Sequence, residues 1–150
     1  MGIIVSSFIG CGREYLKNTH GNKVKIYDAV EQLSKNDAET YFNTVMSVVD
    51  DNDIVFIDTD ENVREIFNEN NIDYDLFYPS SDRRGEFIEN SVRKRLSPKD
   101  IQNLDKNFNK WVEIIDNDES PNCYKHKLNH IGEFIGNEPT IMSYIDNLKN

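Results

Sequence analysis

The residues best placed to do chemistry stand near the start of the chain, where an apolar run over residues 3–8 leads into a glycine-rich turn. In a phosphate-binding loop, a strand ends, glycines let the backbone fold around an anion, and the amides that open the next helix point at phosphate oxygens. The signature of such a loop is G-x-x-x-x-G-K-[ST]. Gly10 and Gly12 fit a turn of this kind, with Cys11 between them. The stretch therefore predicts a site for a phosphate or a nucleotide.

Three residues of this turn depart from the signature. Counting back from Gly12, the first glycine position holds Ser7, the lysine position holds Arg13 and the Ser/Thr position holds Glu14. Arginine keeps the positive charge but replaces a compact ammonium with a wide planar group. A carboxylate at position 14 repels a phosphate at about 4 Å by an energy on the order of several kcal/mol, unless it binds Mg²⁺ itself. A working loop, a disabled loop and no loop at all remain open.

A second acid and a group of basic residues complete the candidate site. Asp28 follows a short predicted strand, where it either contacts a ligand or caps the next helix. Positive charge collects in one predicted helix and its flanks, at Arg83, Arg84, Arg93, Lys94 and Arg95. These side chains either close over phosphates or form a solvated helix face that balances Glu86 and Glu89.

Two further groupings are interpreted as structural. Cys123, His126 and His130 suggest zinc, but on a strand the two histidines stand roughly 13 Å apart by rise alone. Trp111 keeps helical spacing with Phe108, which is typical of a core position. The sequence therefore predicts no metal site among these residues.

Strands and helices alternate along the chain and must position the candidate site. Continuous apolar runs, typical of strands in a parallel sheet, cover residues 3–8 and 54–57, and further strands are predicted over 24–27, 72–78 and, with modest hydrophobicity, 123–128. Helical spacing covers 29–49 (as two helices), 61–70, a segment that begins near 80, 97–115 and 138–148. This order predicts one α/β domain over residues 1–150, with a mainly parallel five-stranded sheet and helices on both faces. Gly10, Asp28 and Asp58 each follow a strand end, so they are expected on one rim of the sheet, where ligands bind.

Composition limits the partners. Lys and Arg total 17 against 27 Asp and Glu, and the net charge of −10 opposes a nonspecific hold on nucleic acid or an anionic membrane. No apolar run approaches the roughly 20 residues that span a bilayer. The two cysteines lie far apart, with no charged-then-apolar leader before them, which favours a reducing compartment. We expect a cytoplasmic protein without a nucleic-acid or membrane partner, and the oligomeric state is left open.

The order of these parts resembles the small phage-encoded P-loop proteins of the nucleoside monophosphate kinase type. The resemblance covers roughly residues 3–135, and its most specific parts are the turn at 7–12 and the segment from Phe77-Tyr78-Pro79 to Phe87-Ile88-Glu89. It implies a three-layer α/β/α fold with a lid-like segment at about 79–97. It also implies that Asp28 contacts the acceptor or a metal, that the lid arginines neutralise phosphate charge, and that an active member uses ATP and Mg²⁺.

Three functions follow as hypotheses. The first is a degenerate kinase-like protein that acts by binding a nucleotide or a host protein, as a phage inhibitor of a host defence (for example of anti-CRISPR type) would in the host cytoplasm. It rests on the double change at Arg13 and Glu14. The second is an active nucleoside or deoxynucleoside monophosphate kinase with a non-standard loop. The third is an acidic nucleic-acid mimic, which rests on net charge alone.

Overall fold

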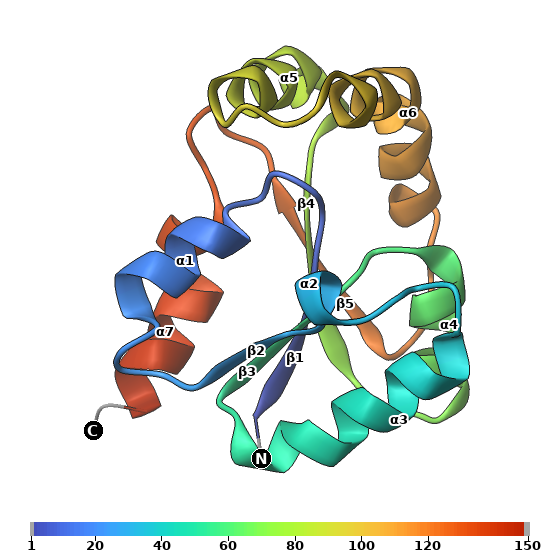
Figure 1. Ribbon diagram of the computed structural model, residues 1–150, viewed down its shortest axis with the longest axis vertical. Helices are drawn as coiled ribbons and strands as arrows, with labels where there is room; N and C mark the ends of the chain where they lie inside the picture. Colours follow the sequence, from blue (N-terminus) through green and yellow to red (C-terminus); the bar gives the residue numbers. More distant parts are fainter. Residues whose placement is uncertain (1, 149–150) are drawn as a thin grey trace.

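The computed structural model describes residues 2–148, which form a five-stranded sheet covered by helices (Figure 1). The strands, in chain order, are β1 (Ile3–Ser7), β2 (Ile26–Asp28), β3 (Ile54–Ile57), β4 (Tyr74–Pro79) and β5 (Cys123–Leu128). Their order across the sheet is β2-β3-β1-β4-β5, and every neighbouring pair is parallel. The predicted α/β class with a parallel five-stranded sheet is confirmed.

Helices cover both sides of this sheet. The helices are α1 (Arg13–His20), α2 (Ala29–Gln32), α3 (Ala38–Val48), α4 (Glu61–Glu69), α5 (Arg84–Arg93), α6 (Pro98–Asp116) and α7 (Pro139–Leu148), with short 3₁₀ turns η1 (Val49–Asp51), η2 (Ser81–Arg83) and η3 (Ile135–Asn137). In Figure 1, α1 and α7 lie together on one side, α3 and α4 lie together on the other, and α5 and the start of α6 lie at the top. Within residues 2–148, no helix combines the length and the apolarity needed to cross a bilayer.

The middle of the sheet is its most apolar part, which is why its strands were recognisable from sequence. All four residues of β3 are fully buried, and β1 is buried from Ile4 to Ser7. A strand that is covered on both faces needs apolar side chains in both directions. Because β1 pairs with both β3 and β4, the turn that follows β1 opens at the centre of the sheet.

Most predicted boundaries agree with the structure within one or two residues. The strands at 54–57 and 123–128 are confirmed, and Ser97 caps α6 by accepting a hydrogen bond from the Asp100 amide at 3.1 Å. The second strand is shifted: it spans Ile26–Asp28 rather than 24–27. The reason is that the Val24 amide donates to the carbonyl of His20, which makes Val24 part of the turn after α1.

Candidate functional site

The glycine turn joins β1 to α1 in a conformation that demands glycine. Gly10 and Gly12 have φ angles of 88° and 98°, in the left-handed region that favours glycine. A Cβ atom on Gly10 would lie 3.0 Å from the ring of Phe87, and one on Gly12 would lie 3.2 Å from Cβ of Phe134. Backbone conformation and close packing therefore both select glycine at these positions.

Cys11, between the two glycines, faces the core rather than a ligand. Its side chain is 1% exposed, and Sγ donates to the carbonyl of Phe77 at 3.7 Å. Its amide donates to the carbonyl of Phe8 at 3.0 Å, and its carbonyl accepts from Ile135 at 2.9 Å. Burial raises the pKa of the Cys11 thiol, so the group stays neutral. The Cys11 amide is thus already used within the turn and is not free for an anion.

The cation at the signature's lysine position is held by an internal acid. Nε of Arg13 lies 2.6 Å from Oδ2 of Asp28, whose side chain is 5% exposed. Lys17, one turn further along α1, lies 2.9 Å from the same oxygen. The Lys17 ammonium also lies 3.1 Å from Glu14 and 2.9 Å from Glu31. Two cations and three carboxylates therefore form one closed network between α1 and α2.

The network shifts the acid–base properties of its two central members. Burial by itself would raise the pKa of Asp28, but the hydrogen bond from Lys17 and the Arg13 charge outweigh it and hold that pKa below its usual value. Burial likewise opposes the charge on Lys17, and its hydrogen bonds to the acids, with Glu31 first, outweigh that and raise its pKa. Asp28 also accepts from the Glu31 amide at 3.3 Å and so caps α2. The prediction that Asp28 caps the next helix is confirmed. The ion pairs of Asp28 with Arg13 and Lys17 were not predicted from the sequence.

The three carboxylates of this network could suit a divalent cation on composition alone. Oxygens of Glu14, Asp28 and Glu31 lie within 4.8 Å of one another. The Lys17 ammonium, however, contacts all three of them. The Lys17 ammonium therefore occupies the place where a metal ion would neutralise these three acids.

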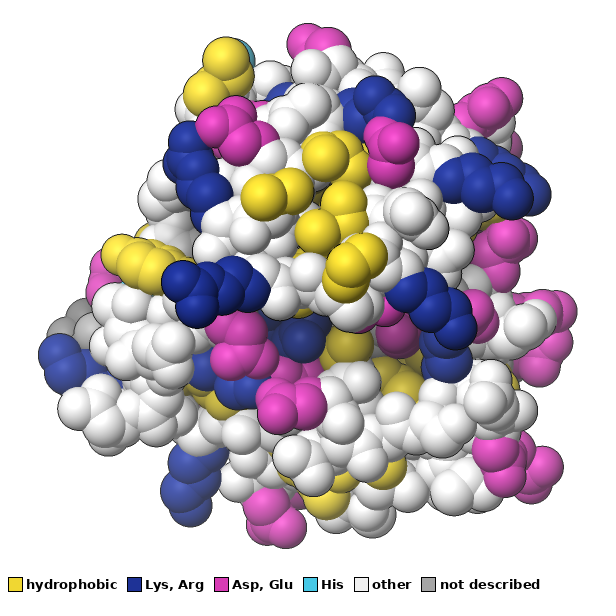
Figure 2. Space-filling model, turned by 45° about the horizontal axis from the view of Figure 1, so that its top comes forward, with side chains coloured by type: hydrophobic (Ala, Val, Ile, Leu, Met, Phe, Trp, Pro, Cys, Tyr) yellow, Lys and Arg dark blue, Asp and Glu magenta, His cyan; other side chains and the backbone are white. Residues whose placement is uncertain are grey.

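Three of the five basic residues between Arg83 and Arg95 are paired with acidic side chains, so they do not face the turn as free cations. Arg83 is 2% exposed, pairs with Glu86 and donates to the carbonyls of Leu128 and Glu133. Arg84 pairs with an aspartate of α6, and Arg93 pairs with a glutamate one turn earlier in α5. Lys94 and Arg95 are exposed at the end of α5. On the face that carries α5 and α6, basic and acidic side chains are interspersed around apolar ones (Figure 2).

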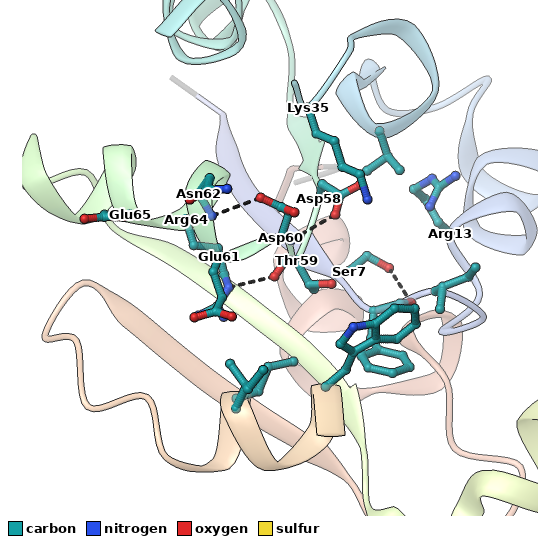
Figure 3. A pocket seen from close by; sticks show the side chains of 16 residues that line it. Ser7, Arg13, Lys35, Asp58, Thr59, Asp60, Glu61, Asn62, Arg64 and Glu65 are labelled. Atoms are coloured by element: carbon teal, nitrogen blue, oxygen red, sulfur yellow. Dashed lines mark hydrogen bonds between the residues drawn. The ribbon is translucent and has the colours of Figure 1, made fainter. Parts of the chain in front are cut away.

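A pocket of about 500 Å³ opens beside the turn, between the C-terminal ends of β1 and β3 (Figure 3). Its two walls differ in chemistry. Phe8, Ile9, Trp111 and two isoleucines of α6 form an apolar side, and Ser7, Arg13, Lys35 and residues 58–62 form a polar one. The helices that follow β1 and β3 cover opposite faces of the sheet, and such a switch point is where parallel α/β sheets bind ligands.

The acids of the polar wall hold the backbone in place. Asp58 accepts from the Asp60 amide at 2.9 Å, and Asp60 caps α4 by accepting from Asn62 and Val63. Within residues 2–148, Lys35 has no acid within 4.0 Å, so its ammonium is the cation of this pocket that no carboxylate neutralises.

Sequence reasoning missed parts of this pocket. Trp111 was expected in the core; its ring lies 6.3 Å from that of Phe8, but the residue is only partly buried and lines the pocket. Lys35 lies in a polar stretch between α2 and α3, and nothing in the sequence around it indicates a binding residue. Asp58 directly follows a fully apolar strand, and this position, like those of Gly10 and Asp28, pointed to the rim of the sheet.

The three residues that suggested zinc, Cys123, His126 and His130, lie on and just after β5, and His126 contacts side chains of β4. Nε2 of His126 lies 2.8 Å from Asp75, and its ring stacks on Phe77 at 4.5 Å between centroids. Within residues 2–148, these three residues form no group with metal-ligand spacing.

Comparisons with known proteins give little further information. No protein-family model matches the chain, and no curated protein matches it. One solved structure that matches is described as an uncharacterized protein from Eubacterium ventriosum; it is 16% identical, with 98% of this chain and 99% of that chain covered, and the TM-score is 0.47. A similarity at this level carries no function over to the present chain.

Proposed function

We propose that this chain is a kinase-like P-loop protein that binds a nucleotide beside its glycine turn and does not transfer phosphoryl groups efficiently. The observation that carries the proposal is the pairing of Arg13 with Asp28 at 2.6 Å. In P-loop proteins, the cation at this position cradles the β- and γ-phosphates, and the next hydroxyl holds Mg²⁺. Here the cation is neutralised from within the protein, and Glu14 replaces the hydroxyl.

Freeing Arg13 for a phosphate is costly. Asp28 is almost fully buried, and breaking a buried ion pair by removing one partner typically costs about 3–5 kcal/mol. Lys17 stays beside Asp28 and would offset part of that cost, but Lys17 is itself shared among three acids. An incoming triphosphate therefore competes with Asp28 for Arg13, and this competition disfavours the geometry that transfer needs.

The pocket still offers what a nucleotide needs for binding. Its volume of about 500 Å³ lies within the ~300–1,000 Å³ of ordinary ligand sites. Trp111 and Phe8 supply an aromatic wall for a base, and Thr59 and Lys35 supply donors for polar groups. Since Lys35 has no acidic partner among residues 2–148, it is the cation of the pocket best placed to bind a phosphate.

A specific observation also favours an active kinase as the second candidate. Asp58 follows β3 and lines the pocket beside Ser7 and Arg13. P-loop enzymes hold Mg²⁺ with an aspartate in a comparable strand-end position. Under this alternative, ATP and Mg²⁺ bind together, and Arg13 leaves Asp28 when they do.

Thermal shift measurements with ATP, GTP and deoxynucleotides, with and without Mg²⁺, test the proposal. A nucleotide at 100 times its dissociation constant should stabilise the protein by about 2.7 kcal/mol, with little effect of Mg²⁺. Trp111→Leu should remove most of this shift, whereas Tyr124→Leu, an exposed aromatic on β5, should not. A parent protein that none of these nucleotides stabilises would contradict nucleotide binding, and a shift that appears only with Mg²⁺ would favour the active kinase.

A further inference from the structure

Arg83 is the most thoroughly enclosed cation of the lid-like segment. Its guanidinium makes a forked pair with Glu86, from Nε to Oε1 and from Nη2 to Oε2, each at 2.8 Å. Its remaining terminal nitrogen donates to the carbonyls of Leu128 and Glu133, at 3.1 and 2.7 Å. Since these contacts occupy all three nitrogens of the guanidinium and the residue is only 2% exposed, this arginine is not available to a phosphate.

The same guanidinium lies against two aromatic rings. Its central carbon is 5.1 Å from the ring centroid of Phe87 and 5.1 Å from that of Phe134. The two rings are 5.9 Å apart. Cations at this distance from an aromatic ring attract it, more strongly when water is excluded. Arg83 therefore joins a ring of α5 to a ring of the segment that follows β5.

Phe87 and Phe134 also lie beside the two glycines of the turn. A Cβ atom on Gly10 would approach the ring of Phe87, and one on Gly12 would approach Cβ of Phe134, closely enough that the neighbour would have to shift. The residue after Phe134, Ile135, donates its amide to the carbonyl of Cys11 at 2.9 Å. Three consecutive residues of the turn are thus contacted by Phe87, by Phe134 and by the amide of Ile135, and Arg83 lies against the first two of these.

We propose that Arg83 is a positioning residue for the glycine turn, acting through Phe87 and Phe134. The lid-like segment then acts on the turn by packing behind it, and not by bringing this arginine onto a phosphate. Any effect of Arg83 on ligand affinity rests on the proposed function, whereas its effect on the conformation of the turn does not.

Cys11 reports on the turn without any ligand. Its thiol is 1% exposed in the turn, while Cys123 is half-buried on β5 and serves as an internal reference. The rate of alkylation by iodoacetamide is measured for each cysteine by peptide mass spectrometry, in the parent, Arg83→Met and Arg84→Met. Arg84 is the matched control, because it is the next residue in the chain, is more exposed and pairs with Asp105 instead of with the rings.

We expect Arg83→Met to raise the Cys11 rate about tenfold or more and to leave the Cys123 rate within about twofold, because the opening is local. The increase should persist without urea and depend weakly on urea concentration, since local opening exposes little surface. Arg84→Met should leave both rates unchanged. Should Arg83→Met fail to fold, Arg83→Lys gives the same readout, because lysine keeps the charge but cannot form the forked pair with Glu86 or lie as a flat group against the two rings.

Two results would overturn the inference: an unchanged Cys11 rate in a folded variant, or an increase that follows global unfolding in urea and affects Cys123 equally. ATP affinity, measured by calorimetry on the same proteins, separates this inference from the proposed function. Local opening of Cys11 together with weaker ATP binding supports both. If Cys11 opens locally in Arg83→Met but the parent does not bind ATP, the role of Arg83 is supported and only the proposed function is contradicted.

Discussion

At the scale of single residues, the turn after β1 is defined by the contacts that its residues make inside the protein. Arg13 is paired with Asp28, Cys11 is turned into the core, and the two glycines pack against aromatic rings. Two features of this site could be predicted in part: the glycine pattern indicates positive φ angles, and acids that follow strands, such as Asp28, are common helix caps. The pairing of Arg13 with Asp28 could not, because it depends on how a turn and a helix separated by 15 residues pack.

Replacing either glycine of the turn should destabilise the protein. Gly10→Ala and Gly12→Ala force alanine into the left-handed region, which costs about 1–2 kcal/mol before any clash with Phe87 or Phe134. Gly85→Ala is the matched control, since Gly85 lies in α5 with open space around its Cβ position; it should stabilise by up to about 1 kcal/mol. Urea unfolding of the three variants measures this difference. Equal stability of Gly10→Ala and the parent would contradict the strained turn.

Because of the ion pairs around Asp28, the free energy of unfolding should decrease at acidic pH. Because the pKa of Asp28 is lowered by folding, its contribution is present above its ordinary value of 3.8 and is lost as the pH drops below that. Asp28→Asn should cost about 2 kcal/mol at pH 7, from the lost hydrogen bonds to charged groups, and should flatten the acid limb of the stability curve. Asn caps helices as well as Asp does, so the variant keeps the cap of α2.

A second cap provides the control for this pH dependence. Asp37 is an exposed cap of α3, and hydrogen bonds from Thr40 lower the pKa of its carboxyl group. Among residues 2–148 it has no ion-pair partner, so Asp37→Asn removes a charged cap alone. We expect a smaller loss than for Asp28→Asn when both are unfolded with urea between pH 3 and pH 7. Losses of equal size at pH 7 would show that the ion pairs with Arg13 and Lys17 add nothing.

At the scale of elements, buried arginines join segments that the sheet does not hold together. Arg64 of α4 is 3% exposed, pairs with Asp118 after α6 and donates to the carbonyl of Thr59 at 3.0 Å. Arg83 similarly ties α5 to the segment after β5. Sequence reasoning expected the basic residues 83–95 at the surface or over a ligand, because charged side chains are rarely buried unless they are paired. It had no means of identifying the distant carbonyls that accept from Arg83.

Removing the buried arginine of α4 should be far more costly than removing an exposed one. Arg64→Met leaves Asp118 without its partner and should cost about 3 kcal/mol or more. Arg84→Met breaks an exposed pair and should cost no more than about 1 kcal/mol. Thermal and urea unfolding of both variants provide the comparison. A loss for Arg84→Met that matches the loss for Arg64→Met would contradict this division.

At the scale of the whole molecule, hydrophobic patterning was sufficient for the class of fold, and side-chain packing determined the site. Central strands are apolar because both faces are covered, so their sequence identifies them, and alternation with helices indicates a parallel sheet. The net charge of −10 is partly structural, since Asp28, Asp37 and Asp60 each cap a helix. The pocket between β1 and β3 combines residues from distant parts of the chain, including Lys35 and Trp111, and its walls follow from tertiary packing alone.

The most direct test of the account compares the parent with Arg13→Lys/Glu14→Ser, which restores the lysine and the hydroxyl of the signature and leaves Ser7 unchanged. Calorimetry with ATP, with and without Mg²⁺, measures binding, and an assay with labelled ATP and a panel of nucleoside monophosphates measures transfer. We predict that the parent binds ATP equally with and without Mg²⁺ and transfers no phosphate, while the double variant gains Mg²⁺-dependent binding. Phosphoryl transfer by the parent itself, at a rate that the double variant does not exceed, would contradict the claim that Arg13 and Glu14 disable the loop.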